Sequence, residues 1–206
     1  MKTLEEIGKS AKSAEPVLRI MGTNQKNEAL LHVAEKLLEE KAFILAENVK
    51  DVEKATANGM AQGMIDRLML DDNRIEGMAE GIRQVAALPD PVGEVTSMKQ
   101  RPNGLRIGQK RVPLGVVGII YEARPNVTAD AFGLCFKTSN VVILKGGSDA
   151  FHSIQAIVTC IRRTLSEANV NSDALLLIED TSREITAAFM KLNQYVDVLI
   201  PRGGAG

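Results

Sequence analysis

Short, almost entirely apolar runs alternate with longer amphipathic stretches in the second half of the chain. The apolar runs predict strands at residues 115–120, 140–144, 174–178 and 196–200. The stretches between them predict helices at residues 126–138, 149–168 and 182–192, the last with a capping box from Thr181 to Glu184. Strands that are apolar on both faces are typical of parallel sheets covered by helices on each side. The pattern therefore predicts an α/β fold with a doubly wound parallel sheet.

The first ninety residues instead have the apolar spacing of amphipathic helices. One helix is predicted to be capped by Asn24, to carry its apolar face as far as Leu45, and to end at Asn58-Gly59. A second helix is predicted to begin near Asp71-Asp72 and to stop before Pro89, because proline breaks a helix.

Residues 92–112 separate the two halves. They contain a turn signal, Pro102-Asn103-Gly104, between two partly alternating runs, and we expect a two-stranded β-ribbon here. Because an isolated hairpin is marginally stable in water, we expect the ribbon to pair with another part of the chain or with a second subunit.

Composition and charge exclude several classes of function. The chain has 206 residues, of which 45% are hydrophobic and 25% charged, as in ordinary soluble domains. Its net charge of -1 gives no reason to expect nucleic-acid or membrane partners, and its apolar runs are too short to cross a membrane. Two widely spaced cysteines, Cys135 and Cys160, fit a reducing cytoplasm, and we interpret both as core residues. We interpret His32 and His152 as solvated or packing residues rather than metal ligands.

Candidate chemistry gathers where two of the predicted strands end. Glu122, Arg124 and Asn126 follow the first strand, and a glycine turn, Lys145-Gly146-Gly147-Ser148, follows the second. Ligands of open parallel sheets bind at the carboxyl ends of the strands, and glycine lets a backbone approach a ligand closely. These two strand ends therefore predict a nucleotide or dinucleotide site.

The last predicted strand runs into Pro201-Arg202-Gly203-Gly204, a turn that normally opens a helix with anion-binding amides. The body of such a helix does not follow, so we expect the chain to be the truncated front part of a longer protein. Because an uncovered sheet edge favours association, we also expect low stability or self-association.

Three segments resemble a known family: YEARPNVT, NVVILKGGSDA and VDVLIPRGGAG are similar to the γ-glutamyl phosphate reductases (glutamate-5-semialdehyde dehydrogenases) of the aldehyde dehydrogenase superfamily. The resemblance implies a Rossmann-like fold and NADPH-dependent reduction of γ-glutamyl phosphate to glutamate 5-semialdehyde and phosphate, through a cysteine thioester, in proline biosynthesis. It also implies N-terminal helices packing on the cofactor domain (1–96), an oligomerisation ribbon (97–112) and an incomplete NADP-binding β/α domain (113–206). The catalytic domain with its nucleophilic cysteine would be absent, and the partners would be a small-molecule substrate and further copies of the chain.

The same resemblance implies roles for single residues. Asn126 matches the oxyanion-hole asparagine, although from the residues alone it also suits a helix N-cap, and the two roles can coexist. Glu122 and Arg124 would contact the substrate, where Arg124 could hold a carboxylate or phosphate or else bridge a neighbouring acid. Ser148 stands where NAD-preferring relatives often carry glutamate, which favours NADP. The full set of expected cofactor contacts is Lys145, Gly146, Gly147, Ser148, Arg202, Gly203 and Gly204.

Two other functions stay open on the residues alone. A nucleotide-binding or interaction module without catalysis would explain binding turns that lack a nucleophile. An oligomerisation scaffold built on the ribbon would explain the turn at Pro102-Asn103-Gly104, but it leaves the polar groups at the strand ends unexplained.

Overall fold

A computed structural model of the chain describes residues 2–202. Its helices are α1 (Leu4–Arg19), α2 (Thr23–Glu39), α3 (Lys41–Ala57), α4 (Gln62–Leu68), α5 (Asp72–Ala87), α6 (Val127–Lys137), α7 (Phe151–Glu167) and α8 (Arg183–Phe189). Its strands are β1 (Val95–Gln100), β2 (Arg106–Lys110), β3 (Val116–Tyr121), β4 (Val141–Lys145), β5 (Leu175–Leu177) and β6 (Val198–Arg202).

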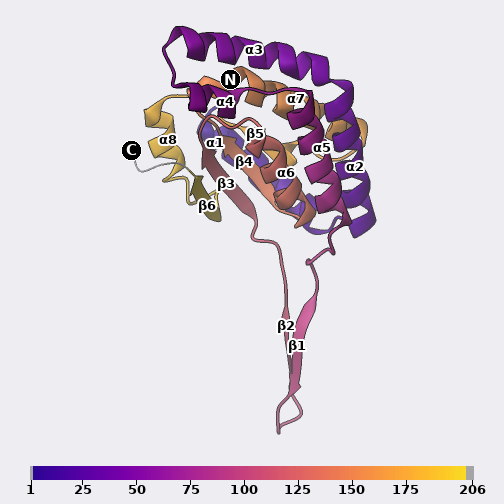
Figure 1. The fold of residues 1–206 in the computed structure, drawn as a ribbon. Helices are drawn as coiled ribbons and strands as arrows, with labels where there is room; N and C mark the ends of the chain where they lie inside the picture. The colour runs from indigo at the N-terminus through magenta and orange to yellow at the C-terminus, as the bar shows by residue number, and fades with distance from the viewer. Residues whose placement is uncertain (1, 203–206) are drawn as a thin grey trace.

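The centre of the molecule is a parallel sheet in the order β5-β4-β3-β6 (Figure 1). The two middle strands, β3 and β4, are buried along almost their whole length, which is why their sequences are so apolar. The chain moves outward from β3 to β4 to β5 and then returns to add β6 on the other side of β3. The predicted doubly wound α/β fold is therefore confirmed.

Helices cover both faces of this sheet. The connections through α6 and α7 run in one direction along the sheet and the connection through α8 runs back, so the rule of right-handed crossovers assigns α6 and α7 to one face and α8 to the other. α1 joins the second face, where Lys12 Nζ lies 2.7 Å from Asp197 Oδ2, just before β6. Asp197 also accepts a hydrogen bond from the Val116 amide (2.7 Å), and a Cβ on Gly115, whose φ is +116°, would collide with it. Through Asp197, the first helix is thus tied to β3 and to the start of β6.

A layer formed by α2, α3 and α5 packs over α6 and α7 (Figure 1). The prediction of one long helix through residues 24–58 is wrong, because the chain turns at Glu40 and both resulting helices can then contact α7. The predicted cap at Asn24 is also wrong: the cap is Gly22, and Asn24 lies within the first turn of α2. The predicted end at Asn58 and the start at Asp71, whose side chain accepts from the Arg74 amide (2.7 Å), are confirmed.

The start of α1 was not predicted from the sequence, and the start of α8 was predicted with the wrong capping residue. α1 begins with a capping box between Thr3 and Glu6. α8 is capped by Ser182, whose hydroxyl accepts from the Ile185 amide (3.3 Å), so the capping box predicted at Thr181 is wrong by one residue. In residues 2–202 none of the helices combines the length and apolar character that a membrane crossing requires.

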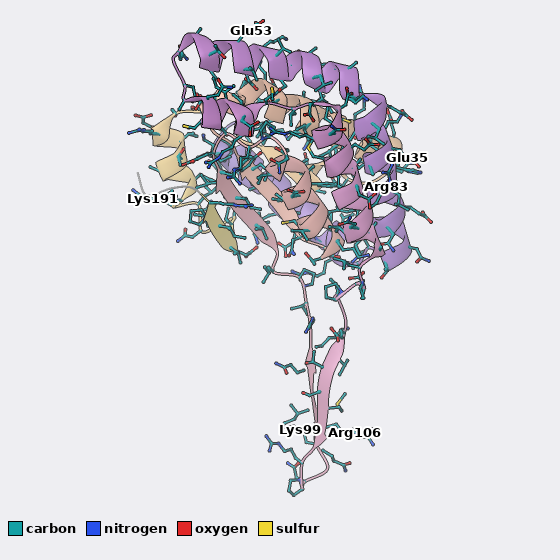
Figure 2. All side chains as sticks on the ribbon, viewed as in Figure 1. Glu35, Glu53, Arg83, Lys99, Arg106 and Lys191 are labelled. Carbon is teal, nitrogen blue, oxygen red and sulfur yellow. The ribbon has the colours of Figure 1, made fainter. Side chains whose placement is uncertain are left out.

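β1 and β2 form the predicted ribbon, an antiparallel pair that projects far from the rest of the molecule (Figure 1). Every residue of both strands is exposed, and Figure 2 shows Lys99 and Arg106 near the distal end. Within residues 2–202 the two strands pair with each other alone, so the alternative of pairing with another part of this chain is wrong for the described residues.

Candidate functional site

The ends of the sheet strands opposite the ribbon surround a cavity of about 590 Å³. Its lining includes residues 121–124 after β3, residues 147–149 after β4, and Arg202 at the end of β6. A further wall is α4, through Met64 and Arg67, and in Figure 1 this helix lies at the end of the sheet away from the ribbon. Of the residues singled out in the sequence, the cavity brings together Glu122, Arg124, Gly147, Ser148 and Arg202.

Asn126 lies beside this cavity in a second cleft of about 530 Å³. It stands at the N-cap position of α6, as expected from the residues alone, but its side chain forms no capping hydrogen bond, and its Nδ2 donates instead to Asp130 Oδ2 over 3.4 Å. Arg67 and Arg124 line both cavities, so the two openings adjoin. An exposed amide donor and two guanidinium groups therefore lie around one part of the surface.

Arg202 closes the site on the side of β6. It is the last described residue and pairs with Tyr121 of β3. Burial raises the pKa of the nearby Asp130 carboxyl, and the charge of Arg202 opposes that rise. Gly203 and Gly204, which the sequence analysis assigned to the cofactor, lie outside the described residues.

Lys145 is buried at the end of β4, with 4% of its surface exposed. Lys145 does not line either cavity as these are formed by residues 2–202. Its Nζ donates a hydrogen bond to the Gly146 carbonyl (3.0 Å). Burial lowers the pKa of the ammonium, and the charge of Asp180, which follows β5, opposes the shift. The lysine thus lies near the ends of β4 and β5, whereas Arg202 lies on the β6 side of the sheet.

Of the two glycines after Lys145, packing explains Gly146 but not Gly147. A Cβ on Gly146 would collide with the Ile154 side chain of α7, so glycine there lets strand and helix approach closely. A Cβ on Gly147 would lie 3.6 Å from the Glu122 backbone, which is an ordinary contact. Close approach of a ligand is therefore not needed to account for Gly146, contrary to the reason expected from the sequence. Ser148, the next residue, is exposed.

The N-terminus of α7 is already occupied by a carboxylate of the protein itself. Asp51, from α3, is 1% exposed, and its Oδ2 accepts from the amide and the hydroxyl of Ser153 (2.8 and 2.6 Å). Its Oδ1 accepts from the His152 amide (3.2 Å). Because helix N-termini attract anions, Asp51 fills the position that a phosphate would take. The turn before α7 therefore presents a lysine and a serine to a ligand, but the amides at the start of α7 already bind Asp51.

Both cysteines are buried. Burial raises the pKa of the Cys135 thiol to about 12 and that of the Cys160 thiol to about 11. Because the thiolate is the reactive form, neither suits a nucleophile, and their interpretation as core residues is confirmed. His32 is exposed, His152 Nδ1 lies 3.7 Å from Glu47 Oε2, and residues 2–202 contain no cluster of potential metal ligands.

Met64, Arg67 and Asp51 were not found from the sequence. Met64 and Arg67 are three residues apart on one face of α4, next to the buried Ile65 and Leu68. The three-residue spacing of Met64 and Arg67 was the sequence signal for this wall of the cavity, and such a signal is weak in a helix of seven residues. Asp51 has no comparable signal, because its partners are distant in sequence.

No protein-family model matches the chain. Curated relatives do match: the γ-glutamyl phosphate reductase of Clostridium botulinum (strain Eklund 17B / Type B) is 54% identical over 206 residues, which is 100% of this chain and 50% of that relative. The same enzyme of Lachnospira eligens is 56% identical over 206 residues, with the same coverage. The chain is thus a homologue of γ-glutamyl phosphate reductase. It spans about half the length of the relatives that it matches.

Solved γ-glutamyl phosphate reductases have the same fold. The crystal structure of the enzyme from Thermotoga maritima is 43% identical, with a TM-score of 0.96 over 100% of this chain and 50% of its own. The enzyme from Saccharomyces cerevisiae is 29% identical, with a TM-score of 0.89 over 99% of this chain and 52% of its own. A probable aldehyde dehydrogenase from Listeria monocytogenes, 16% identical with a TM-score of 0.75 over 98% of this chain and 41% of its own, shares the fold. The fold of this chain is therefore the one seen in γ-glutamyl phosphate reductases, and it is aldehyde dehydrogenase-like.

Proposed function

We propose that the chain supplies the NADP-binding part of an oxidoreductase that uses NADPH to reduce γ-glutamyl phosphate to glutamate 5-semialdehyde and phosphate, in proline biosynthesis. The observation that carries this proposal is the match of the whole chain to γ-glutamyl phosphate reductases at 54% and 56% identity. The cavity at the strand ends supports it, because open parallel sheets bind their ligands there.

In this proposal Asn126 donates a hydrogen bond to the oxyanion that forms when a thiolate attacks an acyl group. The exposed position of its amide, with one contact to Asp130, supports that role. Glu122 and Arg124 contact the substrate, and Arg124 suits a carboxylate or phosphate because a guanidinium can donate two parallel hydrogen bonds.

The proposed cofactor is NADPH. An uncharged Ser148 does not repel a 2′-phosphate, and the nearby Lys145 adds a cation, so this turn suits NADP better than NAD. Because Asp51 occupies the start of α7, we assign the pyrophosphate to the turn after β6 instead. The proposed contacts are Lys145, Gly146, Gly147, Ser148, Arg202, Gly203 and Gly204.

We further propose the division into N-terminal helices (1–96), an oligomerisation ribbon (97–112) and a β/α cofactor domain (113–206), in a cytoplasmic homo-oligomer. Exposed apolar side chains on the ribbon and its turn support the oligomer: Met98 is 62% exposed, Leu105 57% and Ile107 46%. A projecting strand pair with apolar side chains is a surface that a second copy can cover.

By itself the chain is expected to lack reductase activity, because its two cysteines are buried and protonated at neutral pH. The same observation favours the second candidate, a nucleotide-binding module without chemistry of its own. Phosphate- and NADP-dependent oxidation of glutamate 5-semialdehyde by the purified chain would contradict this expectation and point to Cys135 or Cys160.

The test of the proposal is titration of the purified chain with NADPH and, separately, with NADH, followed by nucleotide fluorescence. We expect saturable binding that favours NADPH and weakens in Lys145→Ala and in Lys145→Met, which keeps the buried volume. Lys54→Ala, which removes an exposed lysine of α3, is the matched control and should bind like the wild type. Failure of the wild-type chain to bind either nucleotide would overturn the proposal for this chain.

A further inference from the structure

Two arginines at the candidate site form no ion pair with an acidic residue among residues 2–202. Arg67 on α4 and Arg124 after β3 line both the 590 Å³ and the 530 Å³ cavities. Among residues 2–202, neither forms an ion pair, whereas the neighbouring Arg74 binds Asp66 Oδ1 at 3.0 Å. Glu122 and Asp149 also line the larger cavity and provide its negative charge. Two guanidinium groups from separate elements therefore face the same openings with their donors uncommitted.

The end of α4 that carries Arg67 is held firmly by buried contacts. Asn48, 2% exposed, donates to the Leu68 carbonyl (2.9 Å) and accepts from the Leu70 amide (2.7 Å). Arg74 donates to the Met69 carbonyl (2.6 Å). These bonds fix the backbone on the C-terminal side of Arg67. A cationic side chain on a fixed backbone loses less freedom when it binds an anion.

We infer that Arg67 and Arg124 together bind the phosphate group of the acyl phosphate substrate, an inference that rests on the proposed function. Asn126 lines the second cleft with both arginines, so the anion would lie beside the amide proposed to face the reacting carbonyl. Two guanidinium groups can donate up to four hydrogen bonds to a tetrahedral dianion. A single carboxylate needs one such group, which is why we assign phosphate rather than the substrate carboxylate.

Calorimetric titration with inorganic phosphate, in the presence of saturating NADPH, tests this inference. We expect saturable binding that weakens about tenfold or more in Arg67→Gln and in Arg124→Gln, because each removes charge-assisted hydrogen bonds. Arg67→Lys keeps the charge without the paired donors and should lie between Arg67→Gln and the wild type. Arg83→Gln is the matched control, since Arg83 lies on α5, pairs with Glu80 and lines neither cavity (Figure 2).

Four results would overturn the inference: no phosphate binding by the wild type, equal binding by Arg67→Gln and the wild type, displacement of phosphate by NADPH, or equal loss in Arg83→Gln. A parallel titration with L-glutamate distinguishes binding of a phosphate from binding of the substrate carboxylate. If glutamate binds more tightly than phosphate and depends on the same arginines, the site takes a carboxylate and the phosphate assignment is wrong. NADPH binding by the wild type keeps the two proposals apart. If the wild type does not bind NADPH, the proposed function fails, whereas a wild type that binds NADPH but not phosphate refutes the arginine site alone.

Discussion

Asp51 links α3 to α7 through hydrogen bonds to Ser153 and to the first amides of α7. Both carboxylate oxygens of Asp51 accept hydrogen bonds from α7, and only 1% of the surface of Asp51 is exposed. If the carboxylate is removed, the buried Ser153 hydroxyl loses its acceptor and the positive end of the helix loses its anion, and water cannot easily replace either. The cost of that loss is larger than the gain that the hydrogen bonds provided.

We therefore predict that Asp51→Ala lowers the free energy of unfolding by about 3 kcal/mol, measured by urea denaturation at pH 7. Glu53→Ala is the matched control, because Glu53 is an exposed acid two residues along the same helix (Figure 2). It should change the free energy by less than about 0.5 kcal/mol. Similar losses of unfolding free energy in the two variants would show that the contact of Asp51 with α7 does not contribute more to stability than an exposed acid does.

The sequence could identify those site residues whose neighbours in sequence define their position. Glu122 and Arg124 follow an apolar run, so their place at a strand end was predictable, and the cavity contains both. Arg67 and Asp51 could not be found this way, because their partners come from other elements. Asn126 is an intermediate case: its residue type indicated the start of α6 correctly, but its side chain contacts Asp130 and forms no capping hydrogen bond.

At the scale of elements, apolar runs predicted every strand of the sheet, whereas the helix boundaries were harder. The periodicity of α2 continues into α3 across Glu40, so the sequence alone did not reveal the turn. The turn is imposed by packing, since both helices contact α7. The predicted caps at Asn24 and Thr181 failed because a suitable residue type stood two residues and one residue, respectively, from the position that the tertiary structure selects.

The segment that leads from α5 into the ribbon is anchored to α2 by a buried ion pair. Lys26 Nζ lies 2.5 Å from Asp90 Oδ2, and the two side chains are 1% and 9% exposed. Asp90 also accepts from the Thr23 hydroxyl (2.8 Å) and the Val92 amide (3.0 Å). Burial alone would raise the pKa of the Asp90 carboxyl, but the hydrogen bonds, first that from Lys26, bring it below the ordinary value.

A lowered pKa in the folded state means that this carboxylate stabilises the protein above the unfolded pKa and that the contribution is lost as the pH falls below about 4. We predict that Asp90→Asn lowers the free energy of unfolding by about 3 kcal/mol at pH 7, since it leaves Lys26 buried without its charge partner. The difference from the wild type should shrink in denaturation experiments between about pH 4 and pH 2. A constant difference across that range would contradict the ion-pair explanation.

At the scale of the whole molecule, the ribbon stands apart from one shared hydrophobic core. Residues of the N-terminal helices, such as Leu30 and Ile44, belong to the same buried cluster as Val142 of the central sheet. The ribbon strands add no buried residue to that cluster. Its chain segment therefore has no role in holding the core together.

We predict that replacing residues 95–110 with a short Gly-Ser linker leaves the Tm of the core within about 2 °C, because exposed residues away from packing contacts contribute little to stability. If the ribbon joins subunits, the same change should lower the particle mass measured by light scattering. An unchanged mass would refute the proposed oligomerisation role, and a large drop in Tm without loss of mass would show that the ribbon stabilises the subunit itself.

The contact between Asp51 and Ser153 also sets an order in time. The two residues are 102 positions apart, so their hydrogen bond closes after a large part of the chain has been assembled. During synthesis at roughly 5–20 residues per second, α3 is made about 5–20 s before the helix end that its carboxylate caps. For that interval Asp51 lacks the amide and hydroxyl donors of α7 that satisfy its carboxylate in the folded protein.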